Sequence, residues 1–188
     1  MGAATTRAQI VEAADRLFYR NGFDHTSFAD IAATVGLSRG NFYYHFKSKD
    51  HILGAVIEAR VAERREWLRQ WEAEEPEPAR RIERFIELVL TNREQIQSHG
   101  CPVGTLTTEL AKLEHPMLGQ AACVFTAFRT WLAEQFTLLG QPEQADELAM
   151  HVLAFSQGVA VMANAFGDQA FIAREVDRMR DWLRTYER

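Results

Sequence analysis

The segment Ser38–His45 reads Ser-Arg-Gly-Asn-Phe-Tyr-Tyr-His and is rich in side chains that donate and accept hydrogen bonds. On a helix, Phe42 and Phe46 lie four residues apart on one face and point inward. The opposite face carries Arg39, Gly40, Asn41, Tyr43, Tyr44 and His45. A donor-rich helix fits a DNA major groove, where asparagine pairs with adenine in a bidentate way. The segment therefore predicts hydrogen bonding to nucleic acid.

The polar residues of this region divide into two predicted groups. Arg39, Asn41 and Tyr44 are the candidates for base edges, and Gly40 allows close approach of the backbone. The expected phosphate contacts are Thr26 or Ser27, Tyr43, His45 and Lys49. Ser38 completes the predicted DNA-binding set and also caps its helix. For Tyr43 and His45, the alternative is packing within the protein.

The letters Gly36-Leu37-Ser38-Arg39-Gly40 also spell G-x-S-x-G, the nucleophile elbow of many hydrolases. That elbow requires a preceding strand and later Asp and His partners. A helical pattern precedes it here, and the sequence shows no strand-like alternation. Ser38 is therefore expected to be a helix cap, and no catalytic residue is predicted.

Cys101 precedes Pro102, which is typical of the first position of a helix. Amide donors at a helix N-terminus favour a thiolate, and His99 is close in sequence. One interpretation is a thiol that senses oxidants or electrophiles, and the alternative is a small buried residue. His99, Cys101 and His115 match no metal-ligand spacing, so neither a metal nor a cofactor is predicted.

The elements that position these residues are expected to be helices, because apolar residues recur with a period of 3.6. The predicted boundaries are a cap at Thr5 or Thr6, Gly22, Ser27, Gly36, Ser38, Ser48, Trp71, Pro78, Gly100, Pro102, Pro116, Gly140, Phe166 and Gln169. They give an all-α chain of nine helices. Residues 1–50 are predicted to form a three-helix, helix-turn-helix head, and residues 51–188 a second helical domain.

An aromatic set in residues 51–188 is large enough to line a pocket, although such a set also occurs in ordinary cores. The predicted lining is Trp67, Phe85, Cys101, Phe125, Phe128, Trp131 and Phe155. No buried charge indicates an ionic ligand, so we expect an apolar or planar aromatic one.

The helix that ends near Phe166 is apolar on all sides, and a small protein covers only one side of such a helix. We therefore favour a two-fold dimer interface over a central core helix. Its predicted residues are Val152, Phe155, Val159, Met162, Ala163, Phe166, Met179 and Leu183.

The 188 residues carry a net charge of −5, distributed unevenly. The head has six basic and five acidic residues, so local contacts and helix N-termini must support DNA binding, with strong salt dependence. Two cysteines, no signal-peptide pattern and no run of 18 apolar residues predict a reduced cytoplasmic location and no membrane.

Residues 6–55 resemble the DNA-binding head of the TetR family of transcriptional regulators. The resemblance rests on Gly-Phe-Asp-His-Thr-Ser-Phe-Ala-Asp-Ile-Ala, Val-Gly-Leu-Ser and Gly-Asn-Phe-Tyr-Tyr-His-Phe-Lys-Ser-Lys-Asp. Relatives often have Thr at position 41, so Asn41 is expected to alter base preference. Gly-Cys-Pro-Val-Gly-Thr-Leu and the following Glu-Leu, within 100–110, are similar to a subgroup of multidrug- and electrophile-responsive repressors.

The resemblance implies a homodimer that binds a palindromic double-stranded operator as a repressor. A small-molecule inducer would shift the fourth helix, move the heads apart and weaken DNA binding by the same coupling factor. The alternatives are a thiol-based regulator acting through Cys101, an all-helical enzyme, and an adaptor that only dimerises.

Overall fold

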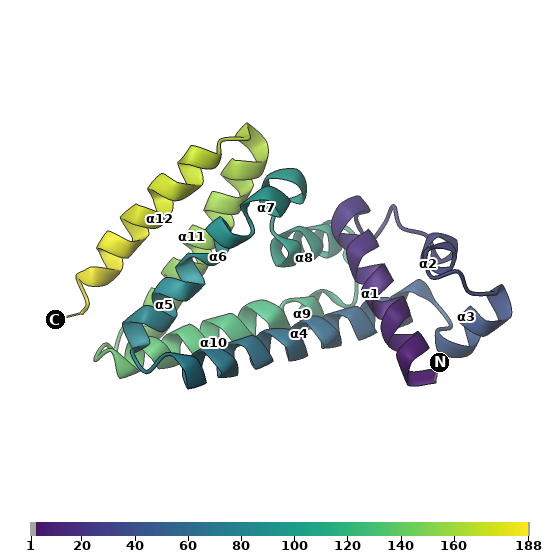
Figure 1. The fold of residues 1–188 in the computed structure, drawn as a ribbon, viewed down its shortest axis with the longest axis horizontal. Helices are drawn as coiled ribbons and strands as arrows, with labels where there is room; N and C mark the ends of the chain where they lie inside the picture. Colours follow the sequence, from purple (N-terminus) through teal and green to yellow (C-terminus); the bar gives the residue numbers. More distant parts are fainter. Residues whose placement is uncertain (1–2, 188) are drawn as a thin grey trace. The chain divides into compact units, whose positions relative to one another are not determined.

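The computed structural model describes residues 3–187, without the side chains of Ala3, Ala4 and Arg39. Every regular element in this range is an α-helix, and the range contains no strand (Figure 1). The twelve labelled segments correspond to nine helices, because Glu87, Asn92 and Ala122 only interrupt longer helices. The predicted all-α fold and the count of nine helices are therefore confirmed for the described part of the chain.

The chain divides into two compact units, whose boundaries fall inside α4, α8 and α10. The first unit contains residues 1–63 and 105–124, and the second contains 64–104 and 125–188. The first holds α1 (Ala3–Asn21), α2 (Phe28–Thr34), α3 (Arg39–His45), the start of α4 (Lys49–Glu74), most of α8 (Pro102–Lys112), α9 (Leu118–Ala121) and the start of α10 (Cys123–Leu138). Residues 105–124, which we expected within the second domain, thus belong to the compact unit of the head.

The first unit is organised around one buried hydrophobic cluster. Phe42 and Phe46 are fully buried in it, as predicted, and the ring of Phe28 meets Phe42 edge-on at 4.7 Å. Gly36 has φ +64° in the turn between α2 and α3, a left-handed conformation that glycine adopts without strain. Helix α1 begins at Ala3, before the expected cap at Thr5 or Thr6, because alanine is the strongest helix former.

The second unit is a bundle of helices. Its remaining helices are α5 (Pro78–Ile86), α6 (Leu88–Thr91), α7 (Arg93–His99), α11 (Ala145–Phe166) and α12 (Gln169–Arg184). Gly167, with φ +67°, ends α11, and the Asp168 side chain caps α12 by accepting a hydrogen bond from the Phe171 amide at 3.0 Å. Helix α11 packs on α7 and α12, and α12 packs on α5 and α6.

Helix α11 buries one face inside the bundle and exposes the other. Five residues of the predicted dimer interface belong to the protomer's own core and are not available to a partner: Val152, Val159, Ala163, Met179 and Leu183. The face of α11 that remains exposed carries Met150, Ala154, Gly158, Val161, Met162, Ala165 and Phe166. By length and composition alone α11 could cross a membrane, but the packing of its buried face is that of a core helix.

Candidate functional site

The outer face of α3 is exposed because its inner face fills the core. Tyr44 is 72% exposed and Tyr43 41%, and Asn41 and Gly40 are also exposed. The Tyr43 ring lies against Phe28 at 5.0 Å, and the Tyr44 ring meets the half-buried His45 at 5.2 Å. The Ser38 hydroxyl accepts a hydrogen bond from the Asn41 amide at 3.4 Å, so it caps the helix as predicted. Arg39 begins α3, but its side chain lies outside the described part.

Of the predicted phosphate contacts, Thr26 is used inside the protein instead, and the half-buried Lys49 also bonds within it. Thr26 is fully buried, and its hydroxyl donates to the Gly22 carbonyl at 2.7 Å. The Lys49 ammonium donates to the Phe23 carbonyl at 2.8 Å and lies over the Phe23 ring. Both side chains satisfy carbonyl groups of the turn between α1 and α2. Thr26 bonds to a carbonyl four residues back in the sequence, and Lys49 to one 26 residues back.

The same turn is held by an acidic side chain from α8. The Glu109 carboxylate accepts hydrogen bonds from the backbone amides of Phe23 at 2.8 Å and Asp24 at 2.9 Å. Gly22, with φ +85°, allows this approach, because a Cβ on it would lie 2.9 Å from a Glu109 oxygen. The turn therefore has a fixed geometry at the point where the chain enters α2.

Helix α2 begins with a capping box formed by Ser27 and Asp30. The Ser27 hydroxyl accepts from the Asp30 amide at 3.1 Å, and the Asp30 carboxylate accepts from the Ser27 amide at 2.8 Å. Hydrogen bonds from Ser27, first its side chain and then its backbone, hold the pKa of Asp30 below the usual 3.8. Although its hydroxyl forms part of the cap, Ser27 is exposed.

This capping box predicts a small acid-dependent loss of stability. A carboxyl whose pKa is lowered in the folded state stabilises the protein at pH values above its ordinary pKa of 3.8. This stabilisation is lost as the pH falls through the lower pKa of the folded state. We expect Asp30→Asn to melt below the wild type at neutral pH and level with it in acid. Melting curves by circular dichroism measure both. A difference that is equal on the two sides would contradict the assignment.

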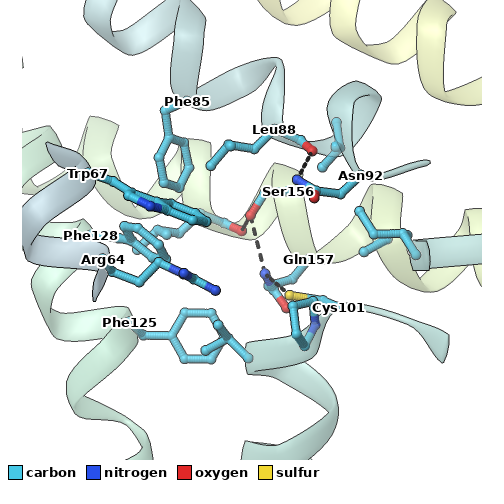
Figure 2. A pocket seen from close by; sticks show the side chains of 16 residues that line it. Arg64, Trp67, Phe85, Leu88, Asn92, Cys101, Phe125, Phe128, Ser156 and Gln157 are labelled. Carbon is cyan, nitrogen blue, oxygen red and sulfur yellow. Dashed lines mark hydrogen bonds between the residues drawn. The ribbon is translucent and has the colours of Figure 1, made fainter. Parts of the chain in front are cut away.

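The second unit contains a mostly apolar cavity of about 110 Å³. Its walls come from α4, α5, α6, α7, α10 and α11 and from the start of α8 (Figure 2). The lining residues are Arg64, Trp67, Phe85, Leu88, Val89, Asn92, Ile96, Cys101, Pro102, Val103, Phe125, Phe128, Leu153, Ser156, Gln157 and Ala160. Four aromatic rings make the cavity suited to a flat ligand.

Five of the seven predicted pocket residues line this cavity, and two do not. Trp131 lies elsewhere: its ring meets Trp71 at 5.9 Å, and its indole donates to the Glu72 carboxylate at 2.8 Å. Phe155 is half-buried on α11 outside the lining set. A helical aromatic pattern shows which residues face inward, but not which side of a neighbouring helix they meet.

The polar part of the cavity centres on Gln157 and Cys101. The Gln157 amide donates to the Cys101 sulfur at 3.4 Å, and that sulfur also accepts from the Gly104 amide at 3.5 Å. A Cβ on Gly104 would lie 2.3 Å from the Gln157 side-chain oxygen, so a larger residue there would require the Gln157 side chain to shift. Cys101 thus caps the first turn of α8, and this arrangement adds nothing in favour of the thiol-sensing alternative.

Within residues 3–187, no group of three His, Cys, Asp or Glu side chains is arranged to hold a metal ion. Residues 10–56 match the family model described as "Bacterial regulatory proteins, tetR family". Residues 78–176, more than half of the chain, match "Transcriptional regulator LmrA/YxaF-like, C-terminal domain". The chain belongs to the TetR family.

Relatives of this TetR-family chain are most similar in the head. The regulator TtgR of Pseudomonas putida is 46% identical over 57 residues, which are 30% of this chain and 27% of that protein. An HTH-type regulator of Lactococcus lactis is 27% identical over 136 residues, 71% of this chain and 69% of the relative. A TetR regulator structure from Legionella pneumophila has a TM-score of 0.82 at 22% identity and covers 98% of both chains. The chain thus spans about a quarter of TtgR, and the structural likeness shows the fold.

The cavity of this TetR-family chain also contains polar residues that our sequence reasoning missed, namely Arg64, Asn92, Ser156 and Gln157. The Arg64 guanidinium carbon lies 3.9 Å from the centroid of the Trp67 ring. Because Arg64 precedes Trp67 by three residues on one helix, the i, i+3 rule could have placed both on one face. Arg64 thus adds a half-buried charge to a pocket for which the sequence indicated an apolar or planar aromatic ligand.

Proposed function

We propose that this protein is a DNA-binding transcriptional repressor that a small ligand releases from a palindromic operator. The observation that supports this most is the outer face of α3, where Asn41, Tyr43 and Tyr44 are exposed while Phe42 is buried. A helix with exposed donors and acceptors, backed by a packed core, suits the major groove. Residues 1–50 would be the DNA-binding domain and residues 51–188 the ligand-binding and dimerisation domain, in the cytoplasm and without catalytic activity.

The proposed roles at the DNA interface rest on the exposure of the side chains and, for Arg39, on the sequence pattern alone. Asn41 and Tyr44, with Arg39, would contact base edges, and Gly40 would allow close approach because it has no side chain. Tyr43, His45 and Ser27 would contact phosphates together with Ser38 at the helix N-terminus.

Substitutions on α3 test the proposal against the enzyme and adaptor alternatives. We expect Tyr43→Ala to weaken binding to all operator variants by a similar factor, and Asn41→Ala to change the preferred base at one position by roughly 1–3 kcal/mol. Fluorescence anisotropy with duplexes from the promoter beside its own coding sequence measures both. Asn21→Ala, an exposed asparagine at the end of α1, is the matched control. No specific, salt-sensitive binding to any duplex would refute the repressor.

The exposed face of α11 is the proposed dimer interface, with Met162 and Phe166 kept from the predicted set and Phe155 half-buried beside it. Small residues along this face, Ala154, Gly158 and Ala165, permit close approach of a second helix. Apolar surface that is exposed along one helix is typical of a two-fold interface.

Phe166→Asp is expected to break the dimer. Phe166 is 77% exposed at the C-terminal end of α11, and a charge placed in an apolar interface loses burial and adds a desolvation cost. We expect the dimer dissociation constant to rise by at least about tenfold, since roughly 1.4 kcal/mol corresponds to that factor. Analytical ultracentrifugation measures it. Leu138→Asp, which changes another exposed apolar residue on α10, is the control and should stay dimeric.

A further inference from the structure

The cavity of the second unit has one cationic side chain, Arg64, and no acidic one among its lining residues. In Figure 2 the Arg64 guanidinium points into the cavity, on the side of Gln157 and Cys101. Its position over the Trp67 ring engages the face of the planar group. Hydrogen bonds to a carboxylate use the edge of a guanidinium, so stacking and anion binding are compatible.

Gln157 supplies a second donor at the same end of the cavity. Its amide nitrogen donates to the Cys101 sulfur at 3.4 Å and to the Ser156 hydroxyl at 3.3 Å. Sulfur is a weak acceptor, so exchanging this bond for one to a carboxylate oxygen is favourable. The Gln157 oxygen faces Gly104, which orients the nitrogen end of the amide away from that residue.

The rest of the cavity fixes the shape and size of the ligand. Trp67, Phe85, Phe125 and Phe128 present four rings to it, a lining that suits a flat apolar body. Its volume is about 110 Å³. An apolar cavity of about 150 Å³ binds benzene, so this smaller, partly open cavity takes at most one ring, and seating that ring requires side chains of the lining to move.

We propose that this cavity binds a single-ring aromatic carboxylate, with the ring among the aromatic side chains and the carboxylate held by Arg64 and Gln157. Such a carboxylate would be the inducer of the proposed repressor. Binding to the cavity is independent of the proposed function, and only the inducer role rests on it. The absence of acidic lining residues disfavours lipophilic cations, whose charge would face the guanidinium.

Three matched probes test the charge requirement on the full-length protein without DNA. They are benzoate, its neutral analogue benzamide and the cation benzylammonium, titrated by calorimetry and by melting temperature. We expect benzoate to bind roughly 10–100-fold more tightly than benzamide, as charge-assisted hydrogen bonds predict, and benzylammonium to bind weakest. Equal binding of benzoate and benzamide, preference for benzylammonium, or no binding of any probe would each overturn the proposal.

A substitution identifies the residue responsible. Arg64→Met keeps the length of the stem and should abolish the preference for benzoate over benzamide. Arg65→Met removes the same charge from the next, exposed position and should keep that preference. Equal loss in both variants would overturn the assignment. If Arg64→Met does not fold, the three probes on the wild type still decide.

A separate measurement distinguishes this proposal from the repressor mechanism. Operator binding by anisotropy is repeated with saturating benzoate. Benzoate that binds through Arg64 without releasing DNA would support the ligand class and count against ligand-induced release. An operator complex that forms normally in a protein that fails the benzoate test would overturn only the ligand class.

Discussion

Phe42→Ala is expected to unfold the head, whereas Tyr44→Ala, two residues further along α3, should leave the fold intact and weaken operator binding. Phe42 is fully buried, and Tyr44 is 72% exposed. Deleting a buried phenylalanine ring costs about 3–5 kcal/mol, because both the burial and the packing are lost. An exposed ring away from the core contributes about 0.5 kcal/mol or less to stability. Urea denaturation and operator anisotropy, measured on both variants, separate the two effects.

The pair serves as its own control, since each variant removes one aromatic ring from the same short helix. A stable Phe42→Ala protein would mean that the buried cluster of the first unit does not depend on this ring. A Tyr44→Ala protein with wild-type affinity for every duplex would remove Tyr44 from the proposed interface.

Glu109→Ala is expected to weaken operator binding although Glu109 lies on α8, far along the sequence from α3. The substitution removes the acceptor for the Phe23 and Asp24 amides and leaves the part-buried Phe23 amide without its partner. Losing such a partner costs about 1–3 kcal/mol. The turn that leads into α2 should become mobile, so the head would pay an ordering cost when it binds DNA. Hydrogen exchange at these two amides measures the opening directly.

Glu143→Ala removes an exposed glutamate from the loop before α11 and is the matched control. It should leave exchange at both amides and operator affinity unchanged. Wild-type protection of the Phe23 amide in Glu109→Ala would show that the turn is held by other contacts, such as those of Lys49.

Local signals in the sequence were sufficient to predict most of the structure of the head. Capping serines at positions 27 and 38, the turn glycine Gly36 and the spacing of Phe42 and Phe46 each specify structure within a few residues, and each lies where we predicted. These signals work because a cap or a turn is a short-range requirement.

Contacts between residues far apart in the sequence could not be predicted from these local signals. A helix that is apolar on all sides does not show which of its faces packs inside the protomer. We therefore predict that Val152 and Val159 contact a partner, although they fill the protomer's own core. Lys49 is predicted to contact phosphate, but the Phe23 carbonyl that accepts from it lies 26 residues away in the sequence, beyond the range of a local pattern.

The interruptions at Glu87 and Asn92 leave the wall formed by α5, α6 and α7 one continuous helix. The Thr91 amide donates to the Glu87 carbonyl at 3.0 Å and the Ile96 amide donates to the Asn92 carbonyl at 2.9 Å, so helical hydrogen bonds run through both positions. Phe85, Val89 and Ile96 on this wall line the cavity. Because they lie on one hydrogen-bonded helix, a compound that shifts the backbone at one of them must move the other two with it.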